Sequence, residues 1–251
     1  GHPCDWESLR YLSNKYNISL INDNCHALGS SYKGNINYAV KYADIVTQSY
    51  HPVKAITTGE GGSVFSNDNK IDNFIKMYRN HGIERNEKLK SKQGLWLYKM
   101  NHLGYNYRIT DFQCALGISQ LSKLDKFIKK RNSIAFNYNK VLKNYEKFII
   151  PSVSKNVKHS YHIYPLRINF KKTSINKKKL FVQMKKSGIN LMVHYIPIHL
   201  QPFYKKRYNF KLGDYAISEK FYREQCSLPI YPNLNTEQQN FIIGKLIKYT
   251  N

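Results

Sequence analysis

The sequence feature that most constrains the fold of this chain is an apolar strand that leads directly into a polar, proline-interrupted turn. Residues 44–47 are typical of a buried β-strand, and Pro52 followed by a glycine-rich run at 59–62 requires a sharply bending backbone. In open α/β sheets, ligands bind beyond the carboxyl ends of the strands. Lys54 lies at such a place, where a desolvated lysine amine can form a Schiff base with a carbonyl. The same pattern also fits a solvated loop lysine.

Helical and strand-like segments alternate around this stretch. Asp5 is placed to cap a first helix, and the apolar run 18–21 predicts a short strand that ends at Asp23. The alternation continues to Val46. It predicts a parallel sheet with crossover helices.

The following segments predict one more strand and two helices. Residues 62–66 favour a strand, and apolar residues recur at helical spacing over 71–78. Thr110 and Gln113 have the spacing of a capping box, so we expect a long helix to start there and to continue towards Arg131.

The pattern changes near residue 126, where a lysine-rich helix is followed by alternating strands and two more helices. Residues 161–168 predict a strand of a second, smaller α+β unit, and Thr236 is placed to open a last helix. We therefore expect two domains, 1–125 and 126–251.

Composition narrows the class of protein. The 251 residues are 41% hydrophobic and 14% aromatic, which is typical of a globular chain and not of a disordered one. No apolar run approaches the roughly 20 residues of a membrane span, and no signal-peptide pattern opens the chain. The four cysteines lie far apart without metal-ligand spacing, which favours a reducing cytoplasm and no metal site.

The formal net charge of +24 suggests attraction to an anion such as a nucleotide diphosphate, a nucleic acid or a membrane surface. Lysines occur in short runs at 171–172, 177–179, 185–186 and 205–207. No zinc-finger, helix-turn-helix or RNP-type motif accompanies these runs, so we expect no specific nucleic-acid partner.

Six segments, in order along the chain, resemble the motifs of the DegT/DnrJ/EryC1/StrS nucleotide-sugar aminotransferases; they are residues 21–29, 49–62, 79–82, 104–113, 193–199 and 228–232. The resemblance implies an α/β fold of the fold type I, aspartate-aminotransferase-like class that uses pyridoxal 5'-phosphate (PLP). It also implies a large domain with a mainly parallel sheet and a smaller α+β C-terminal domain. Whole members of the family begin well before the segment that resembles residues 1–5. Residues 1–125 would then be the C-terminal part of a truncated PLP-binding domain, with a sheet edge that needs covering.

The resemblance also implies the cofactor-binding residues. Lys54 would hold PLP and act as the general base and acid, and Asp23 would keep the pyridine nitrogen protonated so that the ring accepts electrons. His26 would pack at the ring or its phenolic oxygen. Ser49 would bind the phosphate, and Asn106 would be lent to the phosphate of the partner subunit in a homodimer with shared active sites.

Substrate-binding residues are implied in the same way. They are Arg108, His194, Tyr195 and His199, whereas we expect Glu60 to order the turn after Lys54. Without PLP chemistry, Asp23 would be a strand-end turn residue, Arg108 a partner of Asp111, and the histidines strand packing. Two histidines five residues apart without a carboxylate do not indicate a metal.

The implied reaction transfers an amino group, with L-glutamate as donor, to a keto-sugar carried on a nucleotide diphosphate. Lys54 separates the chain from related sugar dehydratases, which have His at that position. Residues 51–62 most resemble the branch that aminates C4 of a 4-keto-6-deoxy sugar, including the transaminases of pseudaminic-acid synthesis. Two alternatives remain open at this point: an incomplete piece that binds no cofactor, and a basic, non-catalytic binding protein that reuses the fold.

Overall fold

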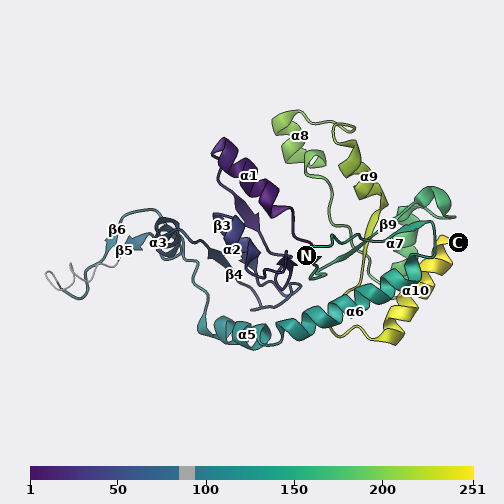
Figure 1. Cartoon of the computed structure of the whole chain (residues 1–251), viewed down its shortest axis with the longest axis horizontal. Coiled ribbons are helices and arrows are strands. Elements are labelled where there is room, and N and C mark those ends of the chain that lie inside the picture. The colour runs from purple at the N-terminus through teal and green to yellow at the C-terminus, as the bar shows by residue number, and fades with distance from the viewer. Residues whose placement is uncertain (85–93) are drawn as a thin grey trace. The chain divides into compact units, whose positions relative to one another are not determined.

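The computed structural model describes residues 1–84 and 94–251, which divide into two compact units (Figure 1). The N-terminal unit contains residues 2–125 and 156–158. The C-terminal unit contains residues 126–155 and 159–251 together with Gly1. That these units serve as a cofactor-binding domain and a small domain stays a prediction.

The N-terminal unit is built on a three-stranded sheet with the order β1-β3-β4. Strands β1 and β3 pair in parallel, and β3 and β4 pair antiparallel. The elements are α1 (Trp6–Tyr16), β1 (Ile21–Asp23), β2 (Ser31–Tyr32), α2 (Tyr38–Tyr42), β3 (Ile45–Ser49), β4 (Gly62–Phe65), α3 (Asn69–Tyr78), β5 (Ile83–Glu84), β6 (Lys99–Met100), α5 (Asp111–Leu121) and β8 (Val157–Lys158).

Helix α1 begins where the sequence predicts. The Asp5 carboxylate accepts a hydrogen bond from the Ser8 amide at 3.3 Å and one from the Tyr32 hydroxyl at 2.8 Å. The predicted strand ends at Asp23 but begins only at Ile21. Residues 18–20 are held outside the strand because the Leu20 amide donates to the Asp44 carboxylate at 2.6 Å.

The predicted long helix is wrong in one respect: it is two helices. Thr110 forms the expected capping box with Gln113, and α5 then ends at Leu121. The Ser122 hydroxyl donates to the Ser119 carbonyl at 2.9 Å, and the Lys123 amide donates to the Gln120 carbonyl at 3.0 Å. These bonds to residues three positions earlier tighten the last turn and separate α5 from α6 (Leu124–Leu142).

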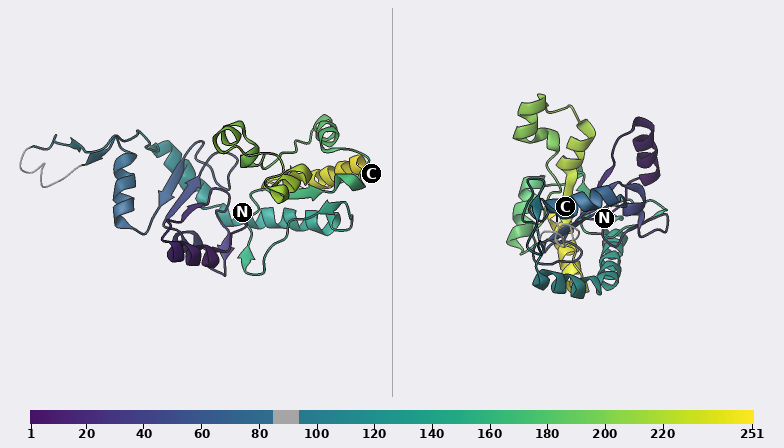
Figure 2. Two further views of the ribbon diagram at one scale, coloured as in Figure 1. Left: turned by 90° about the horizontal axis from the view of Figure 1, so that it is seen from above. Right: turned by 90° about the vertical axis from the view of Figure 1, so that its left-hand side faces the viewer.

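The C-terminal unit contains a second, antiparallel sheet with the order β10-β9-β7. After α6, its elements are β7 (Phe148–Ile149), β9 (Tyr164–Ile168), η1 (Phe170–Lys172), α7 (Lys177–Lys186), η2 (Ile198–Leu200), α8 (Pro202–Tyr208), α9 (Ala216–Glu224), β10 (Gln225–Leu228) and α10 (Thr236–Thr250). Helix α10, drawn yellow in Figures 1 and 2, packs against α7.

Two boundaries in this unit differ from the sequence prediction. Strand β9 starts at Tyr164, later than predicted, because Tyr161 has a positive φ of 48° and its amide donates to the His159 ring. The N-cap of α10 is Asn235, one residue before the predicted Thr236, and it forms a capping box with Gln238.

The hydrophobic cores of the two units differ in size. Among the described residues, the core cluster of the C-terminal unit contains 19 buried side chains, and that of the N-terminal unit contains six: Trp6, Tyr32, Tyr38, Ala39, Ala43 and Val46. The larger apolar core of the described residues therefore lies in the C-terminal unit. Within residues 1–84 and 94–251, no helix combines the length and apolar character needed to cross a bilayer.

A buried arginine ties three segments of the C-terminal unit together. Arg131 is 4% exposed, and its Nη1 donates to the carbonyls of Tyr161, His162 and Ile230 at 2.9–3.1 Å. Burial lowers the pKa of Arg131 to about 10. The charge is retained near neutral pH, where it stabilises three carbonyl groups of irregular backbone.

Replacing Arg131 with Met leaves these carbonyls without their donor, while removing the cost of a buried charge. We expect the free energy of unfolding to fall by about 2–3 kcal/mol, measured by urea denaturation at neutral pH. Lys130→Met, an exposed change on the same helix, is the control and should shift it by less than about 0.5 kcal/mol. Equal effects of the two variants would contradict this role of Arg131.

Candidate active site

The parallel pairing of β1 with β3 places Asp23 at the carboxyl edge of the sheet. Asp23 is in register with Thr47, and the next residue, Asn24, donates its amide to the Thr47 carbonyl at 3.0 Å. The Asn24 side chain is buried and bonded to Gln48 and to the Tyr38 hydroxyl. This network fixes the backbone directly after Asp23.

The Asp23 carboxylate is held in its ionised form. The Cys25 amide donates to Oδ1 at 3.1 Å. Hydrogen bonding from Cys25 lowers the pKa of Asp23, and the nearby side chains of His26 and Lys54 lower it further. Asp23, His26 and Lys54, which are separated in the sequence, therefore interact electrostatically at one site.

Lys54 is half-buried on the turn that follows β3. This turn folds back on Tyr50, whose carbonyl accepts hydrogen bonds from the Thr58 amide and the Thr57 hydroxyl, each at 3.0 Å. The Lys54 amide donates to the His51 carbonyl at 2.9 Å. The predicted phosphate ligand Ser49 is the last residue of β3 and is half-buried at the start of this turn.

Glu60 contributes to this turn through its backbone. Its carbonyl accepts hydrogen bonds from the Thr58 hydroxyl and from the Gln113 side chain, both at 2.8 Å. Its carboxylate is largely exposed and lies 3.9 Å from the His51 ring. The expected ordering of the turn therefore depends on the carbonyl of residue 60 and on α5, which supplies Gln113.

Cys25 and Thr47 are residues of this site that the sequence analysis missed. The Cys25 thiol is hydrogen-bonded to the side chains of Asp23 and Thr47, and burial raises its pKa. The position of Cys25, two residues after an aspartate at a strand end, is the sequence signal of an Asx turn. Register pairing, which places Thr47 beside Asp23, is not visible in the sequence.

Asn106 and Arg108 lie in an exposed segment of the same unit. Arg108 Nε donates to Asn106 Oδ1 at 3.1 Å, and Asn106 forms a backbone bridge with Asn80. The rings of Tyr105 and Tyr107, which flank Asn106, stack with their centroids 4.7 Å apart. The roles of Asn106 and Arg108 towards a phosphate or a substrate stay predictions.

The other predicted substrate residues belong to the C-terminal unit. His194 Nδ1 lies 2.7 Å from Ser227 Oγ, and Tyr195, next to it, is 62% exposed. His199 is 6% exposed, and its Nε2 lies 3.0 Å from Glu219 Oε1. Tyr195 is thus accessible to a ligand, whereas His199 is engaged with a buried carboxylate. Their roles as substrate ligands stay predictions.

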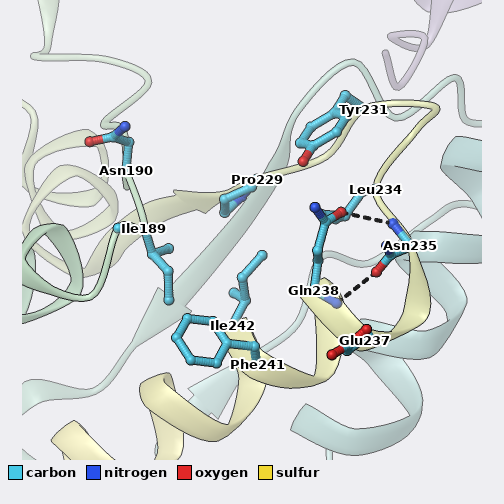
Figure 3. A pocket seen from close by; sticks show the side chains of 11 residues that line it. Ile189, Asn190, Pro229, Tyr231, Leu234, Asn235, Glu237, Gln238, Phe241 and Ile242 are labelled. Carbon is cyan, nitrogen blue, oxygen red and sulfur yellow. Dashed lines mark hydrogen bonds between the residues drawn. The ribbon is translucent and has the colours of Figure 1, made fainter.

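A pocket of about 700 Å³ opens in the C-terminal unit between residues 188–190 and the start of α10 (Figure 3). Apolar side chains, including Ile189 and Phe241, form much of its wall. Asn235 and Gln238 at its rim are bonded to each other in the capping box of α10. None of the predicted site residues lines this pocket, so it is separate from the chemistry discussed above.

Comparison with known proteins identifies a family whose profile matches this chain. The profile of the DegT/DnrJ/EryC1/StrS aminotransferase family matches residues 1–247. An uncharacterized protein of Methanocaldococcus jannaschii is 40% identical over 99% of this chain. A UDP-4-amino-4,6-dideoxy-N-acetyl-beta-L-altrosamine transaminase of Campylobacter jejuni is 38% identical over 96% of it.

The solved structure of a Helicobacter pylori aminotransferase involved in the biosynthesis of pseudoaminic acid matches 99% of this chain, with a TM-score of 0.89 and 31% identity. The chain spans less than two thirds of each of these three proteins: 64% of the archaeal protein, 61% of the Campylobacter enzyme and 64% of the Helicobacter enzyme.

The buried pair of His199 and Glu219 makes stability depend on pH. Hydrogen bonds from His199 and from the Gly213 amide lower the pKa of Glu219 below its usual value of 4.5. A lowered carboxylate pKa stabilises the fold above the usual value and loses that effect as the pH falls through the lowered pKa.

We therefore expect Glu219→Gln to lower the urea midpoint at about pH 7 and to have a much smaller effect at about pH 3. Denaturation curves at several pH values would measure this difference. Glu237→Gln, an exposed change on α10, is the control and should leave the midpoint unchanged throughout. A pH-independent effect of Glu219→Gln would show that the charge of Glu219 is not what stabilises the fold.

Proposed function

This chain belongs to the DegT/DnrJ/EryC1/StrS aminotransferase family, and from that premise we propose that it is the catalytic part of a PLP-dependent sugar-nucleotide aminotransferase. The observation that carries the proposal is the placement of Asp23 at the carboxyl edge of the β1–β3 pair, with Lys54 on the turn that follows β3 and near enough to lower the pKa of Asp23. Among the described residues, no group of three His, Cys, Asp or Glu side chains is arranged to hold a metal.

The side chains present fit the groups of PLP. The amine of Lys54 suits the cofactor aldehyde, and the ionised carboxylate of Asp23 suits a protonated pyridine nitrogen. His26 would lie at the ring and Ser49 at the phosphate, and Asn106 would reach the phosphate of a partner subunit. When bound, PLP supplies an electron sink that makes the α-proton of an amino acid acidic.

Each residue then has a defined task. Lys54 Nζ would hold the cofactor aldehyde at rest, and its free amine would serve as the base that accepts the α-proton of the amino donor and as the acid that gives it up again. The Asp23 carboxylate would hold a proton on the ring nitrogen, because Cys25 and Lys54 stabilise the ionised form of Asp23. Cys25 acts on the reaction only by positioning Asp23.

For the substrates, we propose L-glutamate as amino donor and a nucleotide-diphosphate-linked 4-keto-6-deoxy sugar, aminated at C4, as acceptor. The similarity to the Campylobacter jejuni relative, a UDP-4-amino-4,6-dideoxy-N-acetyl-beta-L-altrosamine transaminase, supports this sugar class. Arg108, His194, Tyr195 and His199 are the proposed substrate-side residues, and Tyr195 is the most accessible of the three in the C-terminal unit. The four unpaired cysteines support a cytoplasmic location.

The test of the cofactor site is direct. The full chain is mixed with PLP, scanned for visible absorption, reduced with borohydride and digested for peptide mapping. We expect one pyridoxyl group, on the peptide that contains Lys54, and none after Lys54→Ala. Lys70→Ala, an exposed lysine change in the same unit, is the control and should retain the adduct.

A second variant separates binding from chemistry. Asp23→Asn should still trap PLP on Lys54 but lower the rate of amino transfer from L-glutamate by about 10²–10³, because the ring nitrogen loses its carboxylate. Rates from single-turnover spectra would measure this. A folded chain that gives no Lys54 adduct would contradict the proposal for this chain and favour an incomplete unit.

We further propose that α5 is covered by a second copy of this chain. Phe112 and Ile118 are 91% and 73% exposed, and no residue of α5 is buried. Leu116 and Leu121 of the same helix are also exposed, and a patch of this many exposed apolar side chains is typical of an interaction surface. Asp111 is the one charged residue of α5, so two copies of a chain with net charge +24 can approach here with little repulsion.

Sedimentation velocity tests this interface. The chain should sediment as a dimer at micromolar concentration, and Phe112→Glu with Ile118→Glu should convert it to monomer. Ile217→Glu, which places the same charge at an 88% exposed apolar residue of α9, should leave the dimer intact. A monomeric parent chain would contradict the proposed dimer. It would not affect the test of the cofactor site, which depends only on whether PLP forms an adduct with Lys54.

A further inference from the structure

A second hollow in the C-terminal unit gathers positive charge away from the residues discussed so far. It has a volume of about 480 Å³ and lies between η1, the first turn of α7 and the last turns of α9. Lys171, Lys177, Lys220 and Arg223 line it, together with a single acid, Glu224. Its size is in the range of small-molecule sites.

Lys177 is the unusual member of this group. It is half-buried, its Nζ donates to the Tyr222 carbonyl and it lies 4.9 Å from the centre of the Tyr222 ring. Burial lowers the pKa of Lys177, which means that its charge is only partly compensated. A bound anion would offset this cost.

The acids near the hollow are already engaged. Glu224 is bonded by both Nε and Nη2 of Arg167, and Glu219 is bonded to His199 and lies 3.6 Å from Arg223. Over residues 1–84 and 94–251, the ion pairs include none made by Lys171, Lys177 or Lys220. Lysines from three different elements thus line one hollow, and none of the three forms an ion pair with the described carboxylates.

We propose that this hollow is a binding site for the diphosphate group of a small molecule, separate from the cofactor site. The basic side chains that line the hollow outnumber its one carboxylate, Glu224, which Arg167 already binds. This excess of positive charge matches a diphosphate, whose oxygens accept strong hydrogen bonds from ammonium groups. The amino end of α7 lies at the same place and adds partial positive charge. Phe170, which also lines the hollow, offers an apolar wall to the organic part of a nucleotide.

Calorimetric titration of the full chain at about 150 mM salt tests the site, because that salt concentration suppresses diffuse attraction to a basic protein. The first probe is inorganic pyrophosphate and the second is UDP. We expect saturable one-to-one binding of pyrophosphate, weakened at least about tenfold by Lys171→Glu with Lys220→Glu. If UDP binds this site more tightly than pyrophosphate does, the site recognises a nucleotide. If the two probes bind equally, the site recognises the diphosphate group alone.

The matched control is Lys185→Glu with Lys186→Glu, which changes the charge of the chain equally at the other end of α7. The control should change the pyrophosphate dissociation constant less than about twofold. Lys177→Met should also weaken pyrophosphate binding, although the two exposed lysines, Lys171 and Lys220, keep their charges in this variant. If both double variants lost the same affinity for pyrophosphate, the overall charge of the chain would explain the binding and the proposal would be wrong. The absence of saturable binding by the parent chain would also overturn the proposal.

Discussion

The parallel pairing of β1 with β3 is the constraint on which the candidate site depends. It brings the end of one strand, Asp23, beside the strand that leads to Lys54. The two residues are distant in the sequence; the sheet fixes the backbone of Asp23, and the turn that follows β3 fixes the backbone of Lys54. The Asx turn from Asp23 to Cys25 and the turn folded on Tyr50 then set the directions of the two side chains.

The chemistry of the site follows from electrostatics more than from burial. Asp23 is exposed, yet Cys25, His26 and Lys54 favour its ionised form. A carboxylate kept ionised in this way is suited to a cationic ring nitrogen, and it needs no apolar pocket around it. The pocket in Figure 3 differs from this site in two ways: its wall is partly apolar, and the amides of Asn235 and Gln238 at its rim are already hydrogen-bonded to each other.

Local signals in the sequence predicted local structure well. Asp5, Thr110 and Gln113 cap helices as their spacing indicated, because a cap depends on a few neighbouring residues. The break at Ser122, the late start of β9 and the Asn235 cap were missed, because each depends on hydrogen bonds that compete with the regular pattern. Thr47 was missed as a site residue because only strand register reveals it, and Cys25 was missed although its place two residues after Asp23 signals an Asx turn. Arg131 shows the same limit, since its three carbonyl partners lie 30 or more positions away.

The described core clusters of the two units differ in size, with six buried residues in the N-terminal unit against 19 in the C-terminal unit. Local opening costs less free energy where fewer apolar contacts are lost. A ligand that binds only the folded form of the N-terminal unit would add to that cost. Under the proposed function PLP would be such a ligand, and the occupied chain would then resist unfolding more than its side-chain packing alone provides.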